Sequence, residues 1–173
     1  QPSIEFDTGR QLCVLSDNTI ALDSIIYRES VVAGTALVGY IKIIIPDIQG
    51  QPFIWSDGGS NDGNVTNYPS KVNVNNTIQS NSGNKILRVN VTKDFVAGDV
   101  LKIHGAKIQM TGKVDAAYLS LQVNSYNGDD AFMGGSDYIR IGQPTIFSTD
   151  HQVLLQGDSS AIMTEKIIIK DSD

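Results

Sequence analysis

Two clusters of Asp, Asn and Gly are the segments of this chain whose composition best suits a chemical function. The first runs over residues 57–64 and the second over residues 127–137. Calcium takes about six to eight oxygen ligands, which Asp and Asn supply, and glycine permits the sharp turns of such loops. The candidate ligands are Asp57, Asn61, Asp62, Asn64, Asp129, Asp130 and Asp137. We therefore expect calcium as a cofactor at these loops. Solvated turns are the alternative, since neither segment has EF-hand spacing.

Catalytic chemistry has little support in this sequence. The histidines His104 and His151 each adjoin residues typical of strands, and ordinary surface positions explain both. No nucleophile elbow, zinc-binding HExxH, phosphate-binding loop or paired-cysteine motif is present. The single cysteine, Cys13, lies in an apolar run, so we expect a buried small hydrophobe. No enzymatic activity and no catalytic residues are predicted.

Aromatic residues and sequons leave two carbohydrate-related possibilities open. Trp55 and Tyr68 flank a polar stretch and would form a sugar-stacking face, although a role in the core is favoured with only one Trp and 7% aromatics. Asn-x-Ser/Thr sequons occur at Asn64, Asn75 and Asn90. In a secreted protein these asparagines would be glycosylation sites on exposed positions.

Composition limits the classes of protein to which the chain can belong. A length of 173 residues with 40% hydrophobic residues suits one domain with a proper core. The net charge of -6, without a basic stripe, argues against nucleic acid as a partner. No apolar run reaches the length of about 18 residues that membrane insertion requires, and no signal peptide opens the chain.

Polar residue choice and hydrophobic alternation both predict strands. Sixteen Asp stand against three Glu, with twelve Asn and sixteen Gly, a composition that favours turns over helices. Apolar and polar residues alternate over 86–91 and 118–123, as in strands with one buried face. Strands are predicted at 3–6, 11–15, 19–27, 36–45, 53–55, 71–74, 85–91, 99–103, 116–124, 138–141, 152–155 and 161–170, with a long polar loop over 56–67. We expect an all-β fold, an antiparallel β-sandwich of Greek-key or jelly-roll type with an extended terminal strand.

The beginning of the chain recurs near its end. An offset of 142 residues places Gln1 on Gln143. Identical residues align at Gln1/Gln143, Pro2/Pro144, Ile4/Ile146, Leu12/Leu154, Ile20/Ile162, Ile25/Ile167, Ile26/Ile168 and Ser30/Ser172. A sheet that accepts its own end can also accept the equivalent end of a neighbouring subunit. A tandem array, with residues 1–142 as one unit and 143–173 beginning the next, explains the same repeat, and chance similarity between strand-rich segments is the third reading.

Two segments resemble parts of microbial surface proteins. Residues 90–103 are similar to a strand, Ala-Gly-Asp turn and strand found in cohesin-like, immunoglobulin-like and S-layer-like sandwich modules, and residues 36–46 resemble the same modules. With the terminal repeat and the Asp-Gly-Asn loops, the whole is similar to donor-strand filament subunits and to the calcium-dependent tubule proteins called cannulae. The resemblance implies an extracellular, cell-surface subunit whose groove accepts a strand from the next subunit, with calcium at the joints.

The leading hypothesis is therefore a secreted structural glycoprotein that polymerises with itself. Residues 1–173 would form one sandwich domain, and residues 1–15 would act as a donor-strand arm. Its inward anchors at the subunit interface would be Ile4, Phe6, Leu12 and Val14. The alternative is a carbohydrate-binding or adhesive sandwich module, with glycans as partners, in one unit of a tandem array.

Overall fold

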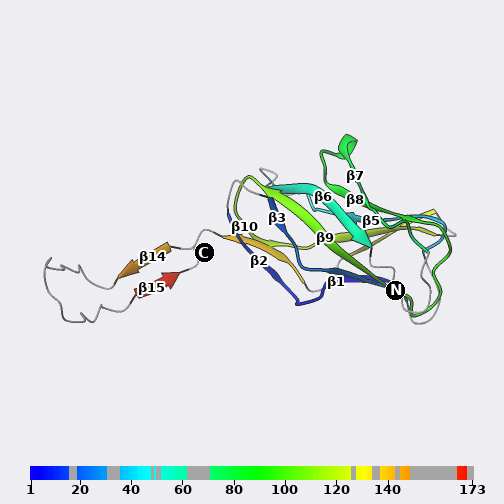
Figure 1. Ribbon diagram of the computed structural model, residues 1–173, viewed down its shortest axis with the longest axis horizontal. Helices are drawn as coiled ribbons and strands as arrows, with labels where there is room; N and C mark the ends of the chain where they lie inside the picture. The colour runs from blue at the N-terminus through cyan, green and yellow to red at the C-terminus, as the bar shows by residue number, and fades with distance from the viewer. Residues whose placement is uncertain are drawn as a thin grey trace, which may run out of the picture.

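The fold is nearly all β, as predicted. The computed structural model describes residues 1–15, 19–30, 36–47, 49, 52–61, 71–125, 128–133, 137–142, 145–148 and 167–170, with the backbone alone for 129–133, 145–148 and 167–170. Several sheets, antiparallel except for one strand pair, form a sandwich-like body (Figure 1). Among the described residues, no helix is long and apolar enough to cross a membrane.

The first large sheet is built around one long strand. Its strands are β1 (Ser3–Phe6), β3 (Thr19–Ala21), β4 (Ile25–Arg28), β6 (Phe53–Asn61) and β9 (Val100–Met110). Strand β9 pairs with β4 through its first residues, with β3 nearer its end, and with β6 along most of its length. Strand β1 pairs with β4 and so borders this sheet. The N-terminal segment is therefore part of the sandwich in this structure.

The second large sheet faces the first across the core. Its strands, in spatial order, are β12 (Gly128–Met133), β11 (Ser120–Ser125), β5 (Gly39–Ile44), β8 (Ile86–Val91) and β7 (Thr77–Gln79), which is followed by the 3-10 turn η1 (Ser80–Ser82). Burial alternates along β8 and β11, as the apolar-polar pattern predicts. Strand β5, which contains Ile41, Ile43 and Ile44, is the central strand of this sheet.

Large apolar side chains from both sheets fill the space between them. The largest fully buried side chains are Trp55, Tyr27, Phe53, Ile25, Ile41, Ile43, Ile45, Leu87, Leu101, Ile103, Ile108 and Leu121. Close packing of such side chains and their removal from water are the main favourable contributions to folding.

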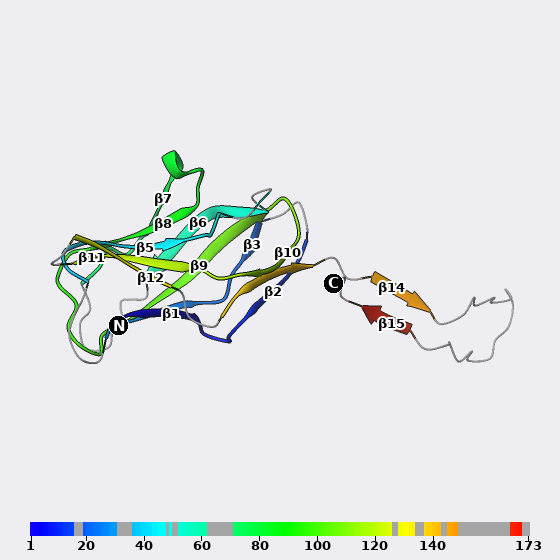
Figure 2. The same ribbon diagram turned by 180° about the vertical axis from the view of Figure 1, so that it is seen from behind.

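The remaining described strands form a three-stranded sheet and a two-stranded sheet. Strands β10 (Val114–Ala117), β13 (Ile139–Gly142) and β2 (Gln11–Val14) form a three-stranded sheet in which β13 and β2 run parallel. Strands β14 (Thr145–Ser148) and β15 (Ile167–Lys170) pair with each other and lie beyond the sandwich in both views (Figures 1 and 2).

The structure corrects several details of the sequence prediction. Residues 56–61 belong to β6 and not to a polar loop, because they pair with β9 beyond a register shift between Trp55 and Asp57. The predicted strand 19–27 is two strands, since the side chain of Asp23 accepts hydrogen bonds from the backbone N–H of Thr8 and Ser24 and fixes a break between them. Strand β9 also continues through His104, where a strand end was expected.

Candidate functional site

The first predicted calcium cluster is largely engaged within the protein. The exposed carboxylate of Asp57 accepts a hydrogen bond from the Gly59 N–H at 3.0 Å and lies 3.5 Å from the Lys107 ammonium. These contacts, the Gly59 hydrogen bond first, lower the pKa of Asp57. At the end of β6, the buried side-chain Nδ2 of Asn61 donates to Asn73 O at 2.6 Å and to Asn76 Oδ1 at 2.9 Å. Its Oδ1 atom has no partner among the described residues.

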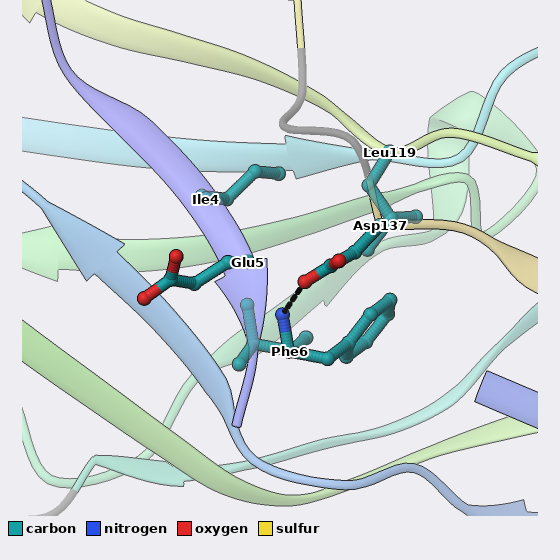
Figure 3. Close-up of a pocket in the computed structure, with 6 residues that line it drawn as sticks. Ile4, Glu5, Phe6, Leu119 and Asp137 are labelled. Carbon is teal, nitrogen blue, oxygen red and sulfur yellow. Dashed lines mark hydrogen bonds between the residues drawn. The ribbon is translucent and has the colours of Figure 1, made fainter. Parts of the chain in front are cut away.

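The second predicted cluster is spread over two elements. Asp129 and Asp130 lie in β12, opposite Asn124 and Val123 of β11. Asp137 precedes β13, and its carboxylate accepts a hydrogen bond from the Phe6 N–H at 2.9 Å, beside a small pocket (Figure 3). Asp137 thus ties the end of β1 to the start of β13.

Calcium binding at these clusters stays a prediction. In the part of the chain that the structure describes, no three His, Cys, Asp or Glu side chains gather in a group that could hold a metal ion. Asp62 and Asn64 lie outside the described residues, and only the backbone is described for Asp129 and Asp130.

The other predicted polar sites have ordinary surroundings. Asn75 is exposed, and Asn90 is partly exposed near the end of β8, whereas Asn64 lies outside the described residues. Glycosylation of these asparagines stays a prediction. His104 is exposed and forms a hydrogen bond with Ser60 Oγ at 3.0 Å, and His151 lies outside the described residues.

Trp55 and Cys13 belong to the packing of the domain. Trp55 is fully buried, so the sugar-stacking role considered for it is wrong and its assignment to the core is confirmed. Tyr68 lies outside the described residues. Cys13 is partly buried against the core, and this burial raises the pKa of its thiol.

The four predicted interface anchors fall into two pairs with opposite surroundings. Ile4 and Phe6 point into the protein's own core, with exposed fractions of 3% and 5%, and line the pocket beside Asp137 (Figure 3). Leu12 and Val14 lie on β2 with exposed fractions of 63% and 57%. Only the second pair is free to contact another molecule without a change in the fold.

The terminal repeat has a structural counterpart. Strand β1 pairs with β4 in the register Ser3↔Arg28, Ile4↔Tyr27, Glu5↔Ile26 and Phe6↔Ile25. Strand β14 pairs with β15 in the register Thr145↔Lys170, Ile146↔Ile169, Phe147↔Ile168 and Ser148↔Ile167. Adding 142 to each residue number of the first set gives the second. The repeated sequence therefore adopts the same antiparallel pair in the same register.

A buried polar cluster was not anticipated from the sequence. Lys71 and Asp99 are only 4% and 3% exposed, and Lys71 Nζ lies 2.5 Å from Asp99 Oδ2. Glu29 is 3% exposed, and its backbone N–H donates to Asp99 O at 2.8 Å. Asp99 ends the Ala-Gly-Asp turn before β9, and this turn was the one sequence feature that drew attention to Asp99. Nothing in the sequence paired it with Lys71.

No protein-family model matches this chain, and no curated protein matches it either.

Proposed function

We propose that this chain is a structural module of an extracellular assembly in which copies of one sandwich unit follow each other in series. Residues 1–142 would form a unit, and residues 143–173 would begin the next. The observation that carries the proposal is the identical register of β1 with β4 and of β14 with β15 at an offset of 142 residues. Chance similarity of two strand-rich segments does not predict that match.

The strands that border β4 indicate which strand is missing beside β15, its counterpart in the second copy of the repeat. In the first unit β4 is bordered by β1 on one side and by β9 on the other. Among the described residues, β15 pairs with β14 alone. A strand equivalent to β9 would complete its sheet, and a following copy of the unit would supply one. Unpaired strand edges are otherwise a site of aggregation.

The connection between units would be short. Strand β13 ends at Gly142, and Gln143 and Pro144 alone separate it from β14. Pro2, which Pro144 repeats, is buried in the first unit. A two-residue connection containing a proline restricts the rotation of one unit relative to the next.

Exchange of terminal strands between separate chains is the second arrangement that the repeat permits. In that case β14 and β15 would take the place of β1 and β4 in a neighbour. Ser148 corresponds to Phe6, and Phe6 is buried in the core beside Ile25. A serine would leave unfilled the space that a phenylalanine ring occupies, at a cost of about 3–5 kcal/mol by analogy with Phe-to-Ala core substitutions. In the serial arrangement, a following unit whose own core residues fill the space beside Ser148 would not incur this cost.

The exposed apolar pair on β2 suits contact with the next unit. Val14 lies opposite Gly142 in the parallel pairing of β2 with β13, so it lies where the chain leaves the first unit. Leu12 precedes it on the same face of the strand. A following unit attached two residues later would begin beside these side chains and could cover them.

Three chains test the proposal: residues 1–142, residues 1–173, and residues 1–173 with Ser148→Phe continued by residues 32–142, which completes a second unit with the Phe6 position filled. We expect residues 1–142 to fold with the stability of the 1–173 chain. The backbone amides of Ile167–Lys170 should exchange quickly with solvent in the 1–173 chain and slowly in the two-unit chain.

Two outcomes of this experiment would count against the serial arrangement. If residues 1–142 fail to fold, then the terminal hairpin belongs to the first unit. If the 1–173 chain forms concentration-dependent oligomers in which β15 is protected, then exchange between chains is the correct arrangement.

A further inference from the structure

The buried pair Lys71 and Asp99 lies within the sandwich, and it is independent of the terminal repeat. The two side chains are 5% and 4% exposed, and Lys71 Nζ lies 2.5 Å from Asp99 Oδ2. Removing an ammonium and a carboxylate from water is expensive, and their attraction often fails to offset that cost. A stable module therefore gains little from this pair as a simple ion pair.

The environment of the pair is both apolar and rigid. The Phe95 ring lies with its centroid 5.6 Å from Lys71 Nζ, and Tyr27 packs against Phe95 edge-to-face at 5.4 Å. The Val96 N–H donates to Asp99 Oδ2 at 2.7 Å, and the Asp99 N–H donates back to Val96 O at 3.1 Å. The carboxyl group is thus fixed against the lysine nitrogen with little freedom to turn away.

A second buried carboxyl group lies at the same end of the sandwich. Glu29 Oε1 accepts a hydrogen bond from the Ser30 N–H, and its Oε2 accepts from the Tyr27 hydroxyl at 2.8 Å and the Ala36 N–H at 2.9 Å. Burial first, and then the charges of Glu29 and Asp99, raise the pKa of Tyr27. The Tyr27 hydroxyl therefore keeps its proton while lying within the electrostatic reach of both carboxyl groups.

We propose that Lys71 and Asp99 condense to form an amide cross-link between Lys71 Nζ and Asp99 Cγ. The ammonium gives one proton to the carboxylate, which yields an amine and a carboxylic acid. The nitrogen lone pair then attacks Cγ, the bond from Cγ to the hydroxyl oxygen breaks, and the hydroxyl leaves as water with a second proton from nitrogen. One amine and one acid give one amide and one water, so no oxidant or other reactant is needed.

Two physical effects favour this reaction inside the protein. Held in contact, the reacting groups have an effective concentration on the order of 10⁵ M or more, as in other well-oriented intramolecular reactions. The product is neutral, so condensation also removes two charges from an apolar environment. Glu29 acts as a positioning residue, because it holds Tyr27 and, through its backbone N–H, the backbone of Asp99.

Intact mass spectrometry of the denatured full chain tests the cross-link. We expect the wild-type mass to be one water molecule below that of the linear chain, and fragmentation to yield a branched peptide that joins Lys71 to Asp99. A full linear mass would overturn the proposal and leave a buried ion pair.

Substitutions separate this water loss from other modifications. Asp57-Gly58 can lose water as a succinimide, but that loss would persist in Lys71→Arg, whereas the cross-link cannot form there. Lys85→Arg is the control, because Lys85 is a partly buried lysine elsewhere in the sandwich whose ammonium donates to Phe53 O at 2.7 Å. This variant should retain the full water loss. A loss retained in Lys71→Arg would contradict the proposal.

The positioning role of Glu29 has its own measurement. In Glu29→Gln, with the fold checked by circular dichroism, we expect the linear form to convert at least tenfold more slowly after synthesis. Conversion at the wild-type rate would exclude that role.

Discussion

The thermodynamic effect of replacing the buried pair distinguishes an amide from an ion pair. Lys71→Met leaves Asp99 buried without a cation, which destabilises a protein by about 3–5 kcal/mol. The double variant Lys71→Met with Asp99→Asn removes both charges. The side-chain oxygen at position 99 can still accept the hydrogen bond from the Val96 N–H. If the wild type contains only an ion pair, this double variant should unfold within about 1 kcal/mol of the wild type or be more stable.

A cross-link changes that expectation by a calculable amount. Lys71 and Asp99 are 28 positions apart, and closing a loop of that length in the unfolded chain is worth about 3.6 kcal/mol in the chain-entropy estimate. With an amide in the wild type, the double variant should therefore be less stable by about 3–4 kcal/mol. The single variant should lose about 3–5 kcal/mol more than the double variant in either case.

Equilibrium unfolding in guanidinium chloride, followed by far-ultraviolet circular dichroism, measures these differences. The midpoints of wild type, single and double variants give the two free-energy gaps. A single variant within 1 kcal/mol of the double variant would refute the reasoning, because an isolated carboxylate at 3% exposure would then carry no penalty.

Further predictions concern the core, acid stability and calcium. Phe6→Ala should lower the free energy of unfolding by about 3–5 kcal/mol, since Phe6 is buried. Leu12→Ala, at an exposed position of β2, should change it by less than about 0.5 kcal/mol. Equal losses of the two variants in urea titrations would contradict the placement of β1. A hydrogen bond from the Thr8 side chain lowers the pKa of Asp23, so its contribution to stability is present above about pH 4 and is lost as the pH falls through the lowered value. In acid titrations followed by fluorescence, the stability of Asp23→Asn should therefore fall less steeply with decreasing pH than that of the wild type. The same pH dependence in both proteins would exclude this contribution. Calcium added to the chelator-treated chain should increase its mass in light scattering, and less so in a variant with Asp129→Asn and Asp130→Asn; a mass indifferent to calcium would refute the calcium hypothesis.

The sequence predicts those strands in which apolar and polar residues alternate. In β8 the apolar residues Leu87, Val89 and Val91 alternate with polar ones, and the structure buries these three. The second half of β6 has no such alternation, because it contains Asp57, two glycines and a serine. It forms a strand through its long-range pairing with β9. Gly59 has φ +64, and a Cβ atom there would meet His104 O at 2.3 Å, so the close approach to β9 requires glycine.

Candidate sites were less predictable than the strands. Clustered Asp and Asn residues suggested calcium ligands, but the fold brings the Lys107 ammonium to Asp57 and the Phe6 N–H to Asp137. The burial of Lys71 and Asp99 depends on the packing of β4, β9 and the segments between them, which no local pattern reports. The terminal repeat was visible in the sequence because it is a comparison of the chain with itself and needs no knowledge of packing.

The parallel pairing of β13 with β2 determines how a series of these units would respond to tension. Force would enter a unit through the beginning of β1 and leave it at Gly142, at the end of β13. Strand β2 is held from its first residue, through the turn that joins it to β1, whereas β13 is pulled from its last residue. Two parallel strands drawn from opposite ends are sheared, so the hydrogen bonds between Gln11–Val14 and Ile139–Gly142 carry the load together and do not open one at a time. Such a unit would resist stretching along the series far better than peeling of its edge strands.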